Sequence, residues 1–191
     1  MIQPNKIAKL AANTKFINRD KTICASDFWA WAYSDLLQNT TRGVLAEYIV
    51  SFLLGTVDEV RNPWDAYDLK LKNGKTIEIK TTAKLQAWAQ KELSKPNIVL
   101  SPTRFWDPKT GKMEEKATFN ADYYIFCYFT AEDHKTANPL DLSQWQFYVF
   151  TKEQLITILN NRKSISLKNL EKQGIKPVGA LELRKTVENI S

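Results

Sequence analysis

The sequence predicts an α/β fold in which a central mixed sheet follows N-terminal helices. Three observations support this: an apolar helical segment at 42–54, a β-hairpin pattern at 67–80, and segments rich in aromatic and β-branched residues at 121–130 and 145–150. The 191 residues suffice for one domain with its own core, and no repeat or linker divides them. We therefore expect a single domain.

The N-terminal extension, residues 1–40, is predicted to contain two helices. The first is expected over 4–17, where Ile7 and Leu10 fall on one side. The second is expected over 27–38, after Ser26 as a helix-capping residue. These helices would form a lid beside the core.

The core, residues 42–150, is predicted to begin with the helix at 42–54. Its sequence, RGVLAEYIVSFLL, is apolar over most of the helix surface, so we expect it to be largely buried and to end at Gly55. Glu47 is the one acid in this apolar run.

Further elements are expected on both sides of the hairpin. A short strand is predicted at 57–61, a helix at 83–92 and a strand at 97–101. The C-terminal part, residues 151–191, is predicted to consist of two helices and a short tail; the helices are expected at 152–160 and 166–173.

Composition excludes several kinds of chemistry. His134 is the only histidine, and Cys24 and Cys127 are far apart without a metal-binding spacing, so histidine-based catalysis, zinc sites and a disulfide framework are not expected. No apolar run approaches the roughly 20 residues that span a bilayer, so we expect no membrane partner and a cytoplasmic location. The net charge of +6 suits a polyanion such as nucleic acid.

The hairpin YDLKLKNGKTIEIK allows two registers. A two-residue Asn73-Gly74 loop would mix apolar and charged side chains on both faces. A three-residue loop that includes Lys72 places all the aliphatic side chains on one face. It places Asp68 directly opposite Glu78, and burial favours this register.

Two carboxylates opposite each other on neighbouring strands repel unless a cation lies between them. Hard oxygen ligands without histidine favour Mg²⁺, or Mn²⁺, over zinc. Lys80 follows Glu78 by two residues and therefore projects to the same face, within reach of a bound phosphate or water. This pattern favours a metal site that can take up a phosphate or water, although an ordinary solvated strand face carries the same residue types.

This arrangement resembles the PD-(D/E)XK nuclease superfamily, which has the restriction-endonuclease-like fold. The matching residues are Asp68, then Glu78-Ile79-Lys80, with Glu47 in the place of an acid from the first helix. The resemblance covers about residues 42–130 and implies a core of helix, three-stranded meander, helix and strand. Tyr67 rather than Pro precedes Asp68, which leaves Asp65 as a rival; we prefer Asp68 because the register puts Asp65 on the apolar side.

The resemblance also implies roles for individual residues. Asp68 and Glu78 would bind Mg²⁺ with the Ile79 carbonyl and Glu47, and Lys80 would position water and stabilise the transition state. Gln86 would help to orient the site. Residues that follow the motif would contact phosphates; these are Lys84, Lys91, Lys95 and Arg104.

The expected function is a metal-dependent nuclease that hydrolyses phosphodiester bonds, with DNA as the preferred substrate and RNA left open. The expected partners are nucleic acid and, for site specificity, a second copy in a homodimer or a partner protein. A catalytically inactive nucleic-acid-binding or regulatory module on the same fold is the alternative.

Overall fold

The computed structural model describes residues 7–17, 22–57, 60–104, 106–107 and 110–190. The helices and strands, in chain order, are α1 (Ala25–Tyr33), α2 (Asn39–Leu54), β1 (Leu69–Lys70), β2 (Thr76–Ala83), β3 (Asn97–Val99), β4 (Trp106–Asp107), β5 (Lys112–Met113), β6 (Tyr123–Phe129), the 3₁₀ helix η1 (Leu142–Gln144), β7 (Trp145–Thr151), α3 (Lys152–Leu159), β8 (Ser164–Ser166), α4 (Leu167–Lys172) and α5 (Ala180–Asn189).

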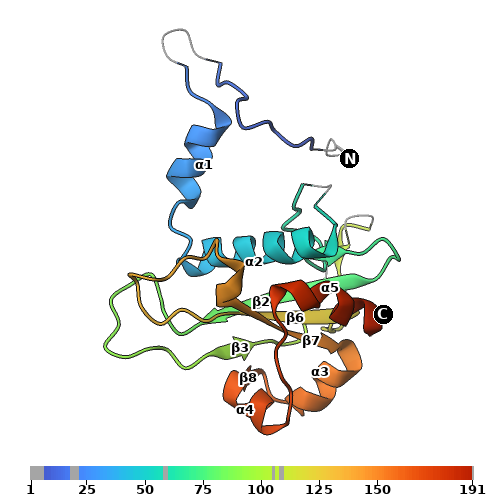
Figure 1. Cartoon of the computed structure of the whole chain (residues 1–191). Coiled ribbons are helices and arrows are strands. Elements are labelled where there is room, and N and C mark those ends of the chain that lie inside the picture. The colour runs from blue at the N-terminus through green and yellow to red at the C-terminus, as the bar shows by residue number, and fades with distance from the viewer. Residues whose placement is uncertain (1–6, 18–21, 58–59, 105, 108–109, 191) are drawn as a thin grey trace.

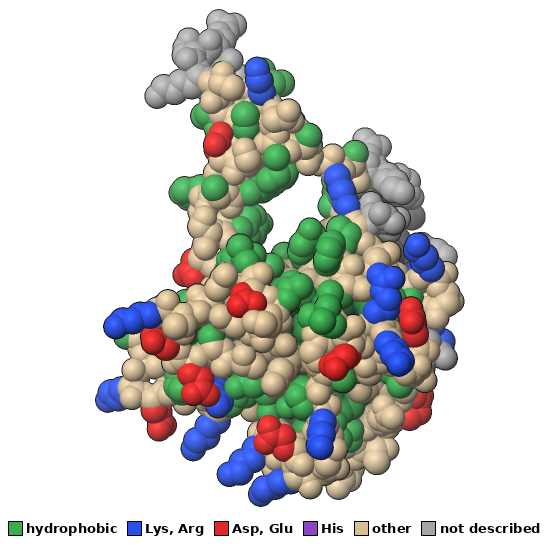
Figure 2. All heavy atoms as spheres, in the orientation of Figure 1, with side chains coloured by type: hydrophobic (Ala, Val, Ile, Leu, Met, Phe, Trp, Pro, Cys, Tyr) green, Lys and Arg blue, Asp and Glu red, His purple; other side chains and the backbone are tan. Residues whose placement is uncertain are grey.

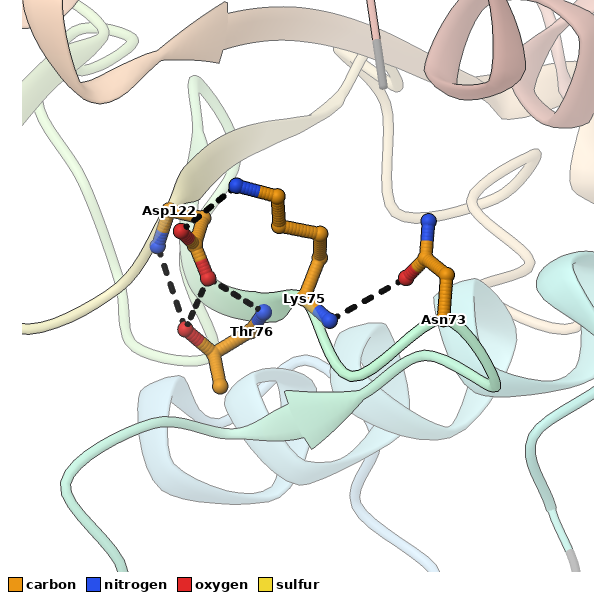
Figure 3. Close-up of polar contacts among 4 residues, drawn as sticks. All are labelled: Asn73, Lys75, Thr76 and Asp122. Atoms are coloured by element: carbon orange, nitrogen blue, oxygen red, sulfur yellow. Dashed lines mark hydrogen bonds and ion pairs between the residues drawn. The ribbon is translucent and has the colours of Figure 1, made fainter.

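A four-stranded mixed sheet forms the centre, as predicted. Its order is β1-β2-β6-β7, in which β2 and β6 are parallel and the two outer pairs are antiparallel. Asp122 fixes the start of the parallel pair: its carboxylate accepts hydrogen bonds from the Thr76 N–H and hydroxyl, both 2.9 Å, and from Lys75 at 3.1 Å (Figure 3). The parallel register therefore begins at a side-chain anchor between the two strands.

Helices and a small second sheet cover the two faces of this sheet (Figure 1). On one face α2 and α5 pack against alternate sheet residues such as Ile79, Ile125 and Phe147. On the other face, Phe126 and Phe150 pack among residues of α3, α4 and the antiparallel pair β3-β8. The strands are thus buried on both faces, which explains their nearly continuous apolar sequences.

Helix α2 ends at Gly55, as the sequence predicts. Gly55 has a left-handed φ of 73°, and its N–H donates to the last turn. The expectation that this helix is largely buried is only half right. Ala46, Ile49 and Val50 lie in the core, whereas Tyr48 is 56% and Phe52 60% exposed.

The N-terminal extension has one helix in its described part, not two. Residues 7–17 are not helical. Backbone groups of Thr14 and Phe16 instead pair with those of Ala25 and Ile23, so this segment lies alongside the residues that lead into α1. The second helix is α1, which begins before 27, with Cys24 rather than Ser26 at its cap, and ends at Tyr33 rather than at 38.

The predicted helix at 83–92 is also wrong. The Gln90 side chain binds the Gln86 N–H, the Lys84 carbonyl and the Ser94 hydroxyl, and the Ser94 N–H donates to the Lys84 carbonyl. Side-chain hydrogen bonds therefore hold this stretch as a closed loop, because Gln90 supplies the partners that a helix would otherwise provide.

Two predicted core strands differ from the structure. Of the segment 57–61, residues 58–59 lie outside the described residues, and the rest is not strand. The described part of the meander is therefore the β1-β2 hairpin alone. The strand predicted at 97–101 exists as β3, but it pairs with β8 outside the central sheet.

The C-terminal helices at 152–160 and 166–173 correspond to α3 and α4, and the expected tail contains a further helix, α5. Its Leu183 and Val187 are buried against α2 and the sheet. In the part of the chain that the structure describes, no helix has both the length and the apolar character needed to cross a bilayer.

Candidate functional site

The β1-β2 hairpin has the predicted three-residue loop. Leu69 pairs with Ile77, and the Leu71 N–H donates to the Lys75 carbonyl. Gly74 closes the loop with a left-handed φ of 88°, which an L-residue adopts only at a cost. The aliphatic residues of the hairpin pack on the α2 side of the sheet. The observed ladder ends at Leu69, and the Asp68 N–H donates to the carbonyl of Ile77, so Asp68 lies near Glu78 at the strand edge rather than as a regular cross-strand partner of it.

Asp68 is anchored at the edge of β2 by two hydrogen bonds. Its N–H donates to the Ile77 carbonyl at 2.9 Å, and its Oδ2 accepts from the Ile79 N–H at 2.6 Å. Strand β1 begins only at Leu69, so beyond the backbone ladder the Asp68 carboxylate accepts the hydrogen bond from the next N–H on the edge of β2. Alternate residues of a strand present their backbone groups to the same side, so the Ile79 carbonyl points toward the same edge.

Two further carboxylates belong to this site, and each has a cationic partner. Glu47 of α2, whose side chain is 13% exposed, binds the Arg61 guanidinium through both of its oxygens, with one contact at 2.8 Å. Glu78, 22% exposed, forms an ion pair with Lys80. Asp65, the rival of Asp68, lies instead in the turn before the hairpin, where it accepts from the Asn62 amide at 2.7 Å.

The charges of Glu78 and Glu47 both act on Asp68. Burial raises the pKa of Asp68 to about 7, with further contributions from the charges of Glu78 and Glu47; the hydrogen bond from Ile79 and the charge of Lys80 offset this only in part. Beneath the site, burial raises the pKa of the Cys127 thiol, and the negative charges of Asp68 and Glu47 raise it further. Negative charge is therefore concentrated at a partly desolvated point.

The donor set suits a hard divalent cation: three carboxylates and a backbone carbonyl, without histidine. The residues that could hold one are Asp68, Glu78, Glu47 and the Ile79 carbonyl. Among the described residues, no three His, Cys, Asp or Glu side chains converge closely enough to hold an ion as they stand. Arg61 and Lys80 already pair with two of the acids, so a bound cation would have to compete with them.

A hollow of about 160 Å³ opens beside Glu78 and Lys80. Its other walls are β3 with the residues that follow it, and the segment from Thr118 to Asn120. Hydroxyl and amide groups of Thr103, Thr118 and Asn120 are hydrogen-bonded to one another on this wall. The hollow therefore combines these neutral hydrogen-bonding groups with apolar side chains such as Val99 and Phe119, next to the charged site.

Gln86 is buried, with 7% exposure, and its hydrogen bonds go elsewhere. Its side chain donates to the Ala83 carbonyl at 3.0 Å and accepts from Arg42 at 3.5 Å. Arg42 is itself 2% exposed and also binds the Leu37 carbonyl. Gln86 thus joins the end of β2 to the start of α2, and an orienting role in catalysis stays a prediction.

The predicted phosphate-contacting cations have different surroundings. Lys84 forms an ion pair with Glu132, so its charge is already matched. Lys91, Lys95 and Arg104 are exposed. Arg104 follows Thr103 and so adjoins the hollow. The other three lie beyond the C-terminal end of β2, past Lys80.

Sequence reasoning missed Arg61 and the polar wall of the hollow. Arg61 falls at the end of a segment expected to be a strand, and nothing in its spacing links it to Glu47, fourteen residues earlier. The wall brings Thr103 next to Thr118 through an isolated β-bridge, which has no local sequence signal. In comparisons with known proteins, no family model and no curated protein matches this sequence.

Proposed function

We propose that this protein is a metal-dependent nuclease that hydrolyses phosphodiester bonds, with DNA as its substrate. The observation that carries the proposal is the group of acids at the hairpin: the charges of Glu78 and of Glu47 on α2 both act on the buried Asp68, and Lys80 pairs with Glu78 on the same strand. This is the arrangement on which the resemblance to the PD-(D/E)XK superfamily depends. The excess of positive charge on the chain is consistent with a polyanionic substrate.

Asp68, Glu78, Glu47 and the Ile79 carbonyl would hold Mg²⁺ or Mn²⁺. A divalent cation supplies Lewis acidity, since it neutralises charge on a phosphate and makes water more acidic. The negative field that raises the pKa of Asp68 is the field that such a cation would relieve.

Lys80 has the second role in the proposal. In the free protein its ammonium pairs with Glu78. With substrate present, it would turn to the phosphate and stabilise the charge that develops there during hydrolysis, as fixed cations do at transferring phosphoryl groups. The hydrogen bond from the Ile79 N–H would meanwhile keep the Asp68 carboxylate in position.

The hollow would receive the part of the substrate next to the scissile phosphate. Its volume of about 160 Å³ is close to that of cavities known to hold one six-membered ring. One base or sugar therefore fits, and the hydroxyl and amide groups of Thr103 and Asn120 offer uncharged hydrogen bonds to it.

The test is cleavage of supercoiled, linear and single-stranded DNA with Mg²⁺, Mn²⁺ or EDTA. Wild type is expected to cut only with metal, and Lys80→Ala should bind DNA but cut at least roughly 100-fold more slowly, the loss typical of one electrostatic catalytic group. Lys185→Ala is the matched control, because it removes one positive charge from the exposed side of α5, on the opposite sheet face. Undiminished cutting by Lys80→Ala would refute the assignment.

A catalytically inactive nucleic-acid-binding module is the second candidate. The ion pairs of Glu47 with Arg61 and of Glu78 with Lys80 favour it, because they neutralise two of the three acids without a metal. Calorimetric titration with Mn²⁺ separates the two. Binding that Asp68→Asn abolishes supports the nuclease, and absence of binding together with salt-dependent DNA affinity supports the module.

A further inference from the structure

We propose that two copies of this chain form a dimer by exchanging their N-terminal arms, so that α1 of each copy lies in an apolar groove on α2 of the other. The N-terminal arm comprises residues 7–17 and 22–34. The α2 groove is the surface hollow lined by Leu45, Tyr48, Ile49 and Phe52 of α2 and by Pro139, Leu140 and Leu142. This inference does not depend on the proposed nuclease activity.

The first observation is that α1 is apolar but hardly buried. Its sequence is ASDFWAWAY, and Ala25 is its one buried residue. Trp31 is 85% exposed, Tyr33 47% and Phe28 45%. A helix with large apolar side chains around its circumference is normally covered by protein, and clustered exposure of this kind marks an interaction site.

The second observation is that the same chain carries a matching receptor surface. The α2 groove has a volume of about 210 Å³ and a mainly apolar lining. Tyr48, Phe52 and Leu140 leave more than half of their surfaces exposed around it. Figure 2 shows an opening between the arm and the body, with hydrophobic side chains gathered along its rim.

The arm cannot fill the groove of its own chain without breaking contacts at its base. The connection from α1 to α2 contains Leu37, which packs on the core. The buried Arg42 holds this connection through bonds to the Leu37 carbonyl at 2.8 Å and to the Asn39 side chain at 2.6 Å. The base is therefore fixed, and α1 stands away from α2 (Figure 1). A second copy supplies the missing helix.

The charge of α1 is also compatible with a second copy of the chain as the partner of the α2 groove. The stretch from Ala25 to Asp35 contains two acids, Asp27 and Asp35, and no Lys or Arg, in a chain whose net charge is +6. Helix α1 therefore brings no positive charge against the basic body of another copy, and the lysines of the described arm, Lys9 and Lys15, both lie before the helix. Two-fold symmetry allows both arms to be covered at once, as in other isologous dimers.

The area is also sufficient. Phe28 and Trp31, which lie three residues apart on one side of α1, would bury roughly 200–300 Å² in each arm, taking 150–250 Å² for a whole aromatic side chain. With the exposed groove residues, two arms give roughly 800–1,200 Å², which reaches the lower end of the range of specific interfaces.

The experiment is sedimentation velocity of the full chain over a range of concentrations. Wild type is expected to be dimeric. Trp31→Glu in the arm and Leu140→Glu in the groove should each give monomers with unchanged circular dichroism, because both side chains are exposed in the single chain. Ile156→Glu is the control: it places the same charge on a half-exposed apolar residue of α3, on the opposite face of the sheet, and should leave the dimer intact.

Mixing identifies the exchange itself. Chains with Trp31→Glu keep an intact groove and chains with Leu140→Glu keep an intact arm, so an equimolar mixture should form heterodimers through one intact contact, more weakly than the wild-type dimer but more strongly than either variant alone. A disulfide should also form between Trp31→Cys chains and Leu140→Cys chains when Cys24 is replaced by Ser. A monomeric wild type, a dimer that survives Trp31→Glu, or a dimer lost with Trp31→Glu but kept with Leu140→Glu would each overturn the proposal.

Discussion

Replacing Asp68 with Asn should stabilise the metal-free protein at neutral and alkaline pH. In the folded chain, burial and the charges of Glu78 and Glu47 raise the pKa of Asp68 to about 7, against an ordinary value of 3.8. The folded state therefore holds this proton more tightly than the unfolded state. It follows that the free energy of unfolding falls as the pH rises from about 4 to about 7.

The gap between the two pKa values sets the size of the effect. It corresponds to roughly 4 kcal/mol of unfolding free energy lost above about pH 7. Asn carries no charge and still accepts the hydrogen bond from Ile79, so Asp68→Asn should avoid this loss. For a chain of this size the gain equals roughly 8–16 °C in Tm.

Urea unfolding of both proteins in EDTA, from about pH 4 to about pH 8, measures this difference. The two curves of stability against pH should meet near pH 4 and separate as the pH rises. Asp65→Asn is the matched control, because it removes a carboxylate from the exposed turn, and it should follow the wild type. Equal or lower stability of Asp68→Asn at about pH 8 would refute the account of the site.

Three further outcomes are expected. Gln86→Leu leaves the buried Arg42 with one acceptor fewer and should cost roughly 1–3 kcal/mol in denaturant unfolding. Gly74→Ala meets no described atom within 4 Å but must adopt a left-handed φ, so it should cost roughly 1–2 kcal/mol without shifting the hairpin register by NMR. Hydrogen bonds, chiefly from the Thr76 N–H, lower the pKa of Asp122. That stabilisation is present above the ordinary Asp pKa and is lost in acid, so Asp122→Asn should unfold with a weaker acid dependence than wild type.

The hairpin could be predicted because local rules agree there. Alternation of apolar residues, the left-handed preference of Gly74 and burial of one face all select a single register. That register alone puts Asp68 beside Glu78, so the centre of the candidate site follows from fourteen consecutive residues. The end of α2 at Gly55 is predictable for the same reason.

The remaining parts depend on contacts between distant segments. The loop after β2 replaces a predicted helix because Gln90 binds backbone groups on both sides of it. Helix α5 is amphipathic, but it starts at Gly179 without a strong capping residue, and its burial depends on α2. Arg61 reaches Glu47 only through the fold. A single sequence contains no local sign of such pairings.

The surroundings of Asp68 explain how a chain without bound metal tolerates three acids at one edge of a sheet. Arg61 and Lys80 neutralise Glu47 and Glu78, and the high pKa of Asp68 lets it hold a proton near neutral pH. A bound divalent cation would neutralise the three acids in place of the two ion pairs and the proton on Asp68. On the proposal made above, it would free Arg61 and Lys80 at the position where a phosphate arrives, so that metal and substrate binding strengthen each other. DNA affinity should then rise with Ca²⁺, and Arg61→Ala should weaken that rise.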